Sequence, residues 1–366
     1  MKESCRAMVL VGPRCMEMQT FPLPAVGDDD GVIEVELAGV CGSDPGIYEG
    51  HPTHGPRPFP LIMGHEIVGR VARAGPSARQ RWGVGEGDRV VVEYAFGCGR
   101  CRACQSGFYT ACENKFNYGS MVSCKNPPHL FGAYSEYLYL HPNAKVHKIG
   151  EEISPEVAVL ICAVLGNGVR WMRQIGGVSI GETVAIVGPG QQGLAAVAVA
   201  KDSGASPIFI IGLEKDRPRL EMAERFGADC TICTDRENAG EIVAEATGGR
   251  MADVVMDASG SPAGAEMALS LAGRNARVIL PGLYKGKKTS WDLDRIVLKE
   301  LRVLGVFSHD YPAVEAAIRM VRNSRYPFED MITHRFPLEQ AEQAVAVAAG
   351  RVPGEMPVKV VIDPKS

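Results

Sequence analysis

The sequence predicts an α/β protein in which a mainly β domain precedes a doubly wound parallel sheet. Up to about residue 150, short β-rich runs are separated by Gly and Pro turns, whereas from about residue 154 strand, turn and helix patterns alternate. The length of 366 residues suggests two domains, at roughly 100–200 residues per domain. With 46% hydrophobic and 22% charged residues, the composition is that of a globular protein and excludes a disordered or fibrous one.

Charge and hydropathy exclude several classes of partner. The chain carries 39 basic and 43 acidic side chains, a net charge of −4, which argues against a nucleic-acid-binding protein. The longest apolar run, Val157–Leu165, has nine residues, whereas a membrane span needs about 18. The first twelve residues contain no secretory signal pattern. We therefore expect a cytoplasmic protein with neither a membrane nor a nucleic acid as partner.

The first predicted domain covers residues 1–153. Its clearest strand candidates are Gly31–Leu37, Ile67–Ala74 and Arg89–Tyr94, each rich in β-branched residues and bounded by turn signals. Short strands joined by tight turns are typical of an antiparallel sheet.

The second predicted domain covers residues 154–309. The apolar strand Thr183–Val187 is followed by a glycine turn and the alanine-rich helix Leu194–Ser203. Further buried strands and amphipathic helices alternate after it: Ile208–Ile211, Arg219–Phe226, Glu237–Ala246, Asp253–Asp257, Ala263–Leu271 and Ala276–Leu280. This alternation predicts a parallel sheet with crossover helices. Residues 310–366, with a helix at Tyr311–Asn323 and a strand at Val358–Ile362, are expected to return to the first domain.

Four cysteines form a dense cluster in a predicted lobe at residues 97–113. Cys98, Cys101, Cys104 and Cys112 have the spacing C-x2-C-x2-C-x7-C, and Gly97, Gly99 and Gly107 allow the backbone to wrap tightly. Four thiolates can close a tetrahedron around zinc and leave no open position, so this zinc would be structural. Free thiols and an iron–sulfur cluster are the alternatives. A disulfide scaffold is disfavoured by the odd count of 11 cysteines and the absence of a secretory signal.

A glycine-rich turn connects the first strand and helix of the second domain. It consists of Gly188, Pro189, Gly190, Gln191, Gln192 and Gly193, a G-x-G-x-x-G pattern. In this strand–turn–helix setting the pattern is a dinucleotide fingerprint, with the pyrophosphate at the helix N-terminus. A purely structural turn is the alternative.

The choice between NAD and NADP depends on the end of the next strand. An acidic residue there binds the ribose 2′-hydroxyl of NAD, and its loss beside cations admits the 2′-phosphate of NADP. The strand is expected to end at Gly212, followed by Glu214, Lys215 and Arg217, which slightly favours NADP. A strand two residues longer would instead place Glu214 at the ribose and favour NAD.

Two segments of the first domain complete a recognisable pattern. Cys41 lies in Gly39-Val40-Cys41-Gly42-Ser43-Asp44, and His65 opens the pattern G-H-E-x2-G-x5-G that runs from Gly64 to Gly75. With the four-cysteine lobe and the glycine turn, these segments resemble the zinc-dependent medium-chain alcohol dehydrogenase family over essentially the whole chain. The resemblance implies a GroES-like catalytic domain and a Rossmann dinucleotide-binding domain. It also implies that Cys41 and His65 bind a catalytic zinc, with Glu66 as an alternative ligand or charge partner.

The third protein ligand of that zinc is open. The family supplies a Cys or an acidic residue shortly before the first strand of the dinucleotide domain. Cys162 lies 26 residues before Gly188, one or two residues from the expected spacing, and Glu156 is the second choice. A buried structural cysteine is the alternative interpretation of Cys162.

The resemblance further implies a reaction. Ser43 would take the proton of an alcohol, Asp44 would orient His65, and a hydride would pass to NAD or NADP. Where many relatives continue the proton relay with a histidine, this chain has Gly46, so that His51, His54 and Tyr48 are the nearby candidates. Two zinc ions per chain, an alcohol, polyol or carbonyl substrate and a homodimer or homotetramer are expected. The alternative is a non-catalytic dinucleotide-binding protein that keeps the fold and the structural zinc.

Overall fold

The computed structural model describes residues 3–51, 57–323 and 326–366, and these form two compact units. The first unit contains the described residues of 1–163, 318–323 and 328–366, and the second those of 164–317 and 324–327. The sequence places domain boundaries at 153/154 and 309/310, and the two main boundaries of this division lie at 163/164 and 317/318.

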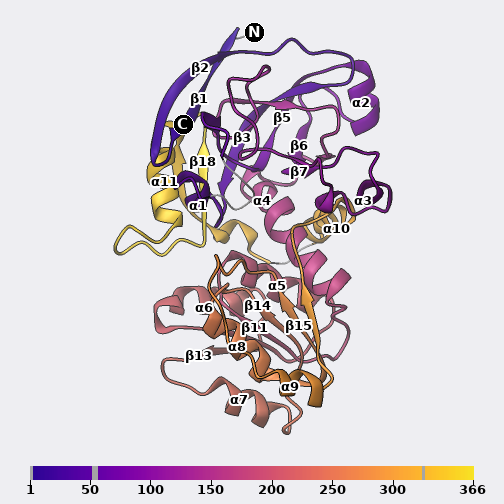
Figure 1. Ribbon diagram of the computed structural model, residues 1–366, viewed down its shortest axis with the longest axis vertical. Helices are drawn as coiled ribbons and strands as arrows, with labels where there is room; N and C mark the ends of the chain where they lie inside the picture. The colour runs from indigo at the N-terminus through magenta and orange to yellow at the C-terminus, as the bar shows by residue number, and fades with distance from the viewer. Residues whose placement is uncertain (1–2, 52–56, 324–325) are drawn as a thin grey trace. The chain divides into compact units, whose positions relative to one another are not determined.

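The first unit is built on a seven-stranded sheet with β3 (Gly31–Val40) near its centre (Figure 1). The strand order is β10-β6-β5-β3-β18-β17, and β9 also pairs with β3. The last strand of the chain lies antiparallel to β3, with Val360 opposite Val40. The other strands of this sheet are β5 (Glu66–Ala74), β6 (Arg89–Val92), β9 (Tyr137–Leu140), β10 (Val146–Lys148), β17 (Ile332–Pro337) and β18 (Lys359–Asp363).

Smaller elements complete the first unit. A three-stranded sheet consists of β1 (Ser4–Gly12), β2 (Cys15–Pro22) and β4 (Leu61–Ile62), and a two-stranded one of β7 (Ala95–Phe96) and β8 (Phe116–Asn117). The helices of this part are α1 (Asp44–Tyr48), α2 (Pro76–Trp82), α3 (Arg102–Gln105), α4 (Pro155–Leu160) and α11 (Ala341–Ala348). The short 3₁₀ turns η1 (Tyr109–Ala111), η5 (Phe328–Met331) and η6 (Leu338–Gln340) join them.

The second unit is a six-stranded sheet whose pairings are all parallel, in the order β13-β12-β11-β14-β15-β16. Its strands are β11 (Val184–Val187), β12 (Ile208–Gly212), β13 (Cys230–Cys233), β14 (Ala252–Asp257), β15 (Ala272–Leu280) and β16 (Arg302–Gly305). The helices of this unit include α5 (Gln191–Asp202), α6 (Arg217–Arg225), α7 (Ala239–Ala246), α8 (Pro262–Leu271) and α9 (Leu293–Leu298), with η4 (Glu214–Asp216) before α6. β11 is a continuous apolar run because both of its faces are buried. The strand order changes direction at β11, as expected for a doubly wound sheet.

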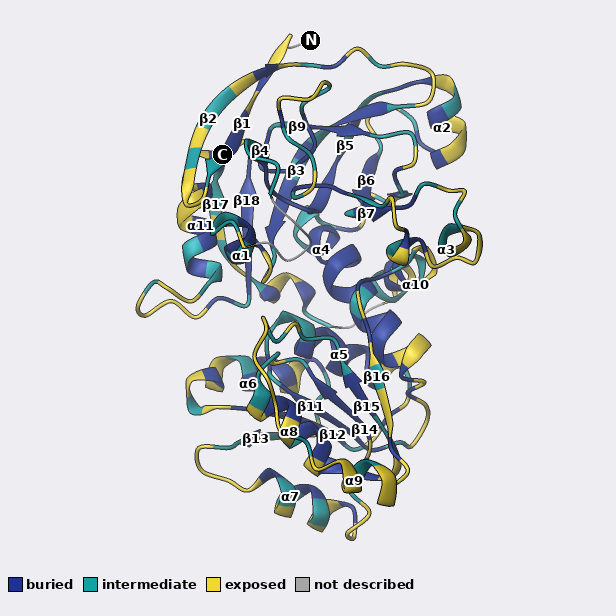
Figure 2. Ribbon diagram, in the orientation of Figure 1, coloured by how far each residue is buried: buried dark blue, intermediate teal, exposed yellow. Residues whose placement is uncertain are grey.

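The division of the chain into two units falls within two helical stretches. One is the helix α10 (Tyr311–Arg322) near the end of the chain, and the other is the stretch Pro155–Ile175, which joins α4 to the π-helical segments η2 (Ile161–Gly166) and η3 (Val169–Ile175). By length and composition alone, these 21 residues with a mean hydropathy of 1.2 could cross a membrane. However, 89% of the stretch's apolar window is buried inside the protein, with α4 dark blue in Figure 2, which is the pattern of a core helix.

Candidate active site and metal centres

The turn after β3 carries the first group of predicted site residues. Asp44 begins α1 and is fully buried, and its Oδ2 accepts hydrogen bonds from the backbone N–H of Cys41 at 2.8 Å and from the hydroxyl of Tyr134 at 3.0 Å. Because a buried carboxylate is stable only when it is paired, these donors hold the turn in one conformation. The thiol of Cys41, at the end of β3, remains partly exposed.

His65 lies directly before β5 and faces this turn. Its Nε2 is 3.3 Å from Ser43 Oγ, and its Nδ1 is 3.3 Å from Asp44 Oδ1. The latter contact is not aligned as a hydrogen bond, and neither of its two atoms has another partner among the described residues. The structure therefore brings Cys41, Ser43, Asp44 and His65 together, as the sequence predicts.

The charges around His65 fit a bound cation. Burial disfavours protonation of the imidazole, yet the neighbouring Asp44 and Cys41 outweigh burial and raise the pKa of His65. The same two groups favour any cation placed at the ring. A thiolate and an imidazole nitrogen are also preferred ligands of zinc, so the residues present fit this metal.

Glu66 lies beside this group and is fully buried. Its Oε2 accepts a hydrogen bond from the ammonium of Lys359 on β18, which also donates to the carbonyl of Val40 at 3.2 Å. The other oxygen, Glu66 Oε1, has no hydrogen-bond partner in the described part of the chain. An unpaired buried carboxylate oxygen is costly, so Glu66 also fits a second, metal-directed role. The sequence analysis missed Lys359, although a lysine opening the apolar run Lys359–Asp363 is a signal of a buried counter-charge.

The two candidates for the third zinc ligand differ in their surroundings. Cys162 is buried, and burial together with the charges of Glu93 and Glu66 raises the pKa of its thiol. A thiolate at this position therefore needs a nearby cation. Glu156 instead accepts a hydrogen bond from Arg335 at 2.8 Å, so the charge of its carboxylate is already paired without a metal. The sulfur and nitrogen atoms of Cys41, His65 and Cys162 do not all lie within 4.8 Å of one another.

The four cysteines of the predicted lobe converge on one point. The sulfur atoms of Cys98, Cys101, Cys104 and Cys112 all lie within 4.8 Å of one another, the only such group of possible ligands within 3–51, 57–323 and 326–366. The sulfurs of Cys101 and Cys112 are 3.7 Å apart. Zn–S bonds of about 2.3 Å in a tetrahedron give sulfur–sulfur distances of about 3.8 Å, so the cluster fits a closed zinc site.

Local backbone features support this lobe. Backbone N–H groups of Arg100 and Cys101 lower the pKa of Cys98 to about 6, which favours the thiolate that binds metal. Gly97 has no room for a side chain, because an added Cβ would lie 3.0 Å from the Cβ of Tyr109 and closer still to the Cys104 sulfur. Gly99 and Gly107 have φ values of 76° and 84°, the left-handed region that favours glycine.

The glycine turn joins β11 to α5 as predicted. Gly188 has a φ of 102°, and an added Cβ would lie 2.9 Å from the backbone nitrogen of Ser259. A Cβ on Gly193 would collide with the carbonyl oxygen of Gly188, so the helix can approach the strand only with glycine there. Gly190 is the N-cap of α5, and a Cβ at Gly190 would meet no protein atom within 4 Å. This open side of the turn is the one suited to a pyrophosphate.

β12 ends at Gly212, as the NADP interpretation expects, and does not continue to Glu214. A Cβ on Gly212 would lie 2.9 Å from Pro189 Cγ, so the strand end packs directly against the glycine turn. Glu214 accepts hydrogen bonds from Arg217 at 2.7 Å and from Arg236 at 2.9 Å. Lys215 is exposed beside them. Arg236 was not foreseen, because it follows β13 rather than β12.

The candidate relay residues make other contacts. His51 Nε2 lies 3.5 Å from Glu49 Oε2, and the His51 side chain is 62% exposed. The Tyr48 hydroxyl donates to the carbonyl of Arg14 at 3.2 Å and to Glu342. His54 lies outside the described residues.

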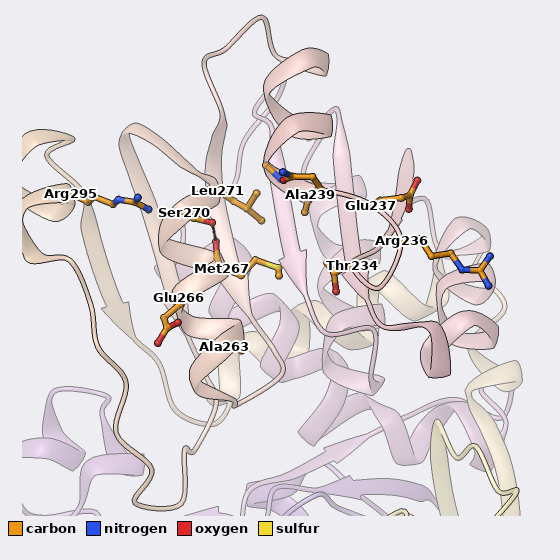
Figure 3. Close-up of a pocket in the computed structure, with 12 residues that line it drawn as sticks. Thr234, Arg236, Glu237, Ala239, Ala263, Glu266, Met267, Ser270, Leu271 and Arg295 are labelled. Atoms are coloured by element: carbon orange, nitrogen blue, oxygen red, sulfur yellow. Dashed lines mark hydrogen bonds between the residues drawn. The ribbon is translucent and has the colours of Figure 1, made fainter.

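A groove of about 850 Å³ opens in the second unit between α7 and α8 (Figure 3). Met267 and Leu271 of α8 line one side of it, and Thr234 and Ala239 lie opposite. None of the site residues predicted from the sequence lines this groove, but Arg236, which donates to Glu214, does, so the groove begins beside the end of β12.

Comparisons with known proteins agree with this geometry. Two protein-family models match the sequence. The family model described as alcohol dehydrogenase GroES-like domain matches residues 27–151, and the family model described as zinc-binding dehydrogenase matches residues 193–323. A probable alcohol dehydrogenase of Mycobacterium tuberculosis is 38% identical over 365 residues, covering 98% of both chains. An erythritol/L-threitol dehydrogenase of Mycolicibacterium smegmatis is 31% identical, covering 99% of this chain and 98% of its own.

Solved structures are similar over the same length. An alcohol dehydrogenase from Thermotoga maritima superposes with a TM-score of 0.90 at 26% identity, covering 98% of this chain and 99% of its own. A zinc-binding dehydrogenase from Sinorhizobium meliloti, described as putative and bound to NADP, has a TM-score of 0.87 at 25% identity, covering 99% of this chain and 100% of its own.

Proposed function

Because the chain belongs to the zinc-dependent medium-chain alcohol dehydrogenase family, we propose that Cys41, Ser43, Asp44 and His65 form its catalytic centre. The protein is an oxidoreductase that transfers a hydride between an alcohol or polyol, or the corresponding carbonyl compound, and a nicotinamide cofactor. The single observation that carries the proposed centre is the position of His65, whose ring nitrogens lie 3.3 Å from Ser43 Oγ and from Asp44 Oδ1, while Asp44 also holds the backbone N–H of Cys41 at 2.8 Å. The relatives give no support to the non-catalytic alternative.

Each residue of the centre has a distinct task. Cys41, His65 and a third ligand would hold a zinc ion, which when bound would act as a Lewis acid and lower the pKa of the substrate hydroxyl. Ser43 Oγ, 3.3 Å from His65 Nε2, receives the proton of that hydroxyl. Asp44 holds the backbone N–H of Cys41 through a hydrogen bond and lies 3.3 Å from His65 Nδ1, where its charge favours one orientation of the ring. We propose Cys162 as the third ligand, because its thiol is buried and not in a disulfide, with Glu66 as the alternative, because Glu66 Oε1 is buried without a hydrogen-bond partner among the described residues.

We further propose two zinc ions per chain. The second is held by the lobe cysteines, whose sulfur spacing suits a closed tetrahedron, and its role is structural. In this account residues 1–153 and 310–366 form the catalytic domain and residues 154–309 bind the dinucleotide, supported by family matches at 27–151 and 193–323.

The dinucleotide is bound by the turn from Gly188 to Gly193, and we propose a preference for NADP. Gly212 stands where NAD-binding relatives carry an acidic residue, and Arg217 and Arg236 converge on the neighbouring carboxylate of Glu214. These guanidinium groups, with Lys215, suit a 2′-phosphate. Binding of NADP and NAD, titrated by protein fluorescence, tests this. Tighter binding of NADP, reversed by Arg217→Ala, is expected, whereas tighter binding of NAD would contradict it.

We also propose that the protein is a homo-oligomer of the cytoplasm. β16 is the open edge of the second unit's sheet, and α9 beside it exposes Leu293, Val297 and Leu298 at 66%, 71% and 71%. A second copy of the chain would cover this surface. All 11 cysteines are free thiols, which supports a reducing compartment. Analytical ultracentrifugation should give a multiple of 39.3 kDa, and a monomer would contradict the oligomer.

The catalytic proposal is tested by following reduced nicotinamide in the presence of a panel of alcohols and polyols. Turnover that is lost on mild chelation and recovered with added zinc is expected. Tight dinucleotide binding without hydride transfer to or from any member of the panel would contradict it.

A further inference from the structure

A buried carboxylate lies between the two predicted metal centres of the first unit. Glu93 directly follows β6 and is 1% exposed. Its Oε1 is 2.9 Å from His147 Nε2 on β10, and its Oε2 accepts a hydrogen bond from the hydroxyl of Tyr109. Two donors from separate elements thus hold this carboxylate, which neither the structural nor the catalytic role assigned above uses.

Tyr109 belongs to the four-cysteine lobe. It lies between Cys104 and Cys112 in the chain, and its carbonyl accepts the backbone N–H of Cys112 at 3.0 Å. The Tyr109 Cβ lies close to Gly97, because a Cβ added to Gly97 would be only 3.0 Å from it. The position of the Tyr109 ring is therefore set by the same turns that bring the cysteine sulfurs together.

The residue after Glu93 contacts the catalytic group. The ring of Tyr94 lies 5.7 Å from the ring of His65, at an angle of 58°. Glu93 is therefore connected through the backbone to the aromatic ring beside His65.

We propose that Glu93 is a positioning residue that couples the four-cysteine lobe to the Cys41–His65 site through the Tyr109 hydrogen bond. The inference rests on the proposed function, since it takes Cys41 and His65 to be metal ligands. When the four thiols of the lobe are held together, the Tyr109 hydroxyl fixes Glu93, and the adjoining residue Tyr94 is fixed beside His65 with it. When this hydrogen bond is lost, the buried carboxylate loses one of the donors that fix its position, and its side chain can shift.

The variant Tyr109→Phe tests this coupling because it removes one hydroxyl and leaves all four thiols in place. The probe is Co²⁺ exchanged into the catalytic site, whose visible absorption reports ligand geometry independently of turnover. We expect a shifted cobalt band and a Co²⁺ affinity about tenfold weaker, the lower end of the range for groups that orient metal ligands. The lobe should retain one zinc per chain.

Tyr139→Phe is the matched control. Its hydroxyl also donates to a carboxylate of the same unit, Asp30 Oδ2 at 2.9 Å, but Asp30 is bonded to neither metal group. The control should keep the cobalt band and affinity of the unaltered protein. If Tyr109→Phe has the same cobalt band and Co²⁺ affinity as Tyr139→Phe, the proposed coupling does not exist.

A second variant tests the coupling in case Tyr109→Phe does not fold. Glu93→Gln keeps the size of the side chain and removes its charge, and it should shift the cobalt band as well. An unshifted band in this variant would overturn the proposal. If the unaltered protein takes up no Co²⁺ beyond the lobe, the proposed catalytic metal site itself fails and the coupling fails with it, an outcome distinct from unchanged variant spectra.

Discussion

Asp44, Glu66 and Lys359 are charged side chains without solvent exposure, and each can be buried only because the fold supplies partners. Asp44 has the N–H of Cys41 and the hydroxyl of Tyr134, and Lys359 has Glu66 and the carbonyl of Val40. Glu66 keeps one oxygen unpaired. These contacts make the fold rigid around the residues that we propose as metal ligands.

Lys359→Met should destabilise the protein strongly. Removing one partner of a buried ion pair leaves the other charge unpaired and costs about 3–5 kcal/mol. Urea unfolding should therefore show a much lower midpoint for the zinc-free variant than for the zinc-free unaltered protein. The double variant Glu66→Gln/Lys359→Met, which buries no charge, should recover much of the loss. If Lys359→Met alone is as stable as the unaltered protein, Glu66 and Lys359 do not form a buried ion pair.

His65→Ala should abolish turnover and leave the fold intact. The imidazole contacts Ser43 and Asp44, and its removal takes away a metal ligand without opening the sheet that carries it. Circular dichroism melting and dinucleotide binding should stay close to those of the unaltered protein. Hydride transfer that persists in this variant would remove His65 from the site.

Among the elements, those with strong local signals could be predicted from the sequence. The strand predicted at Thr183–Val187 is β11, and the helix predicted from Leu194 starts three residues earlier because Gly190 caps it. Lys359 and Arg236 could not be found in this way. Lys359 meets Glu66 across 293 residues of chain, and Arg236 meets Glu214 from the loop after a neighbouring strand. Only the three-dimensional pairing of β18 with β3, and of β13 with β12, creates these contacts.

Two glycines of the turn before α5 should respond differently to substitution by alanine. Gly193→Ala places a Cβ against the carbonyl of Gly188, so α5 must shift, and both stability and dinucleotide affinity should fall. At Gly190 the added Cβ meets no protein atom, so Gly190→Ala should leave the melting temperature unchanged and lower only the affinity for the dinucleotide. Thermal melting and NADP titration check this. Equal melting temperatures for both variants would contradict the packing argument.

The strands β3, β5 and β6 are tied together by Glu36, which accepts hydrogen bonds from Arg70 at 2.9 Å and from Arg89 at 2.6 Å. Burial alone would raise the pKa of Glu36, but Arg89 and Arg70 outweigh it and lower that pKa. A lowered folded-state pKa stabilises the protein above the unfolded-state value of about 4.3, and this stabilisation is lost as the pH falls through the folded-state pKa.

Glu36→Gln should therefore cost stability at pH near 7, by about 1.5–3 kcal/mol for hydrogen bonds to a charged group. The difference from the unaltered protein should shrink as the pH falls below about 4. Urea unfolding over a pH series measures both effects. A difference that does not change with pH would mean that the Glu36 charge does not tie these strands.

On the scale of the whole molecule, short motifs can be recognised in the sequence, whereas the contacts that hold their residues in place cannot. The lobe cysteines and the glycine turn are short motifs, and both form compact sites in the structure. The pairing of Glu66 with Lys359 joins β5 to the last strand of the chain, and the position of Glu93 depends on His147 of β10, so no local pattern encodes either contact. The third zinc ligand could not be identified from the sequence for the same reason, because its position depends on how a buried helix packs against the sheet.

The central claim is that this chain holds a catalytic zinc at Cys41 and His65 in addition to the zinc of the lobe. The most direct measurement is the zinc content per chain, by elemental analysis of untagged protein purified without chelator, for the unaltered protein and for His65→Ala. We predict about two zinc ions for the former and one for the latter. One zinc in both, unchanged after zinc is added back, would contradict the catalytic metal site.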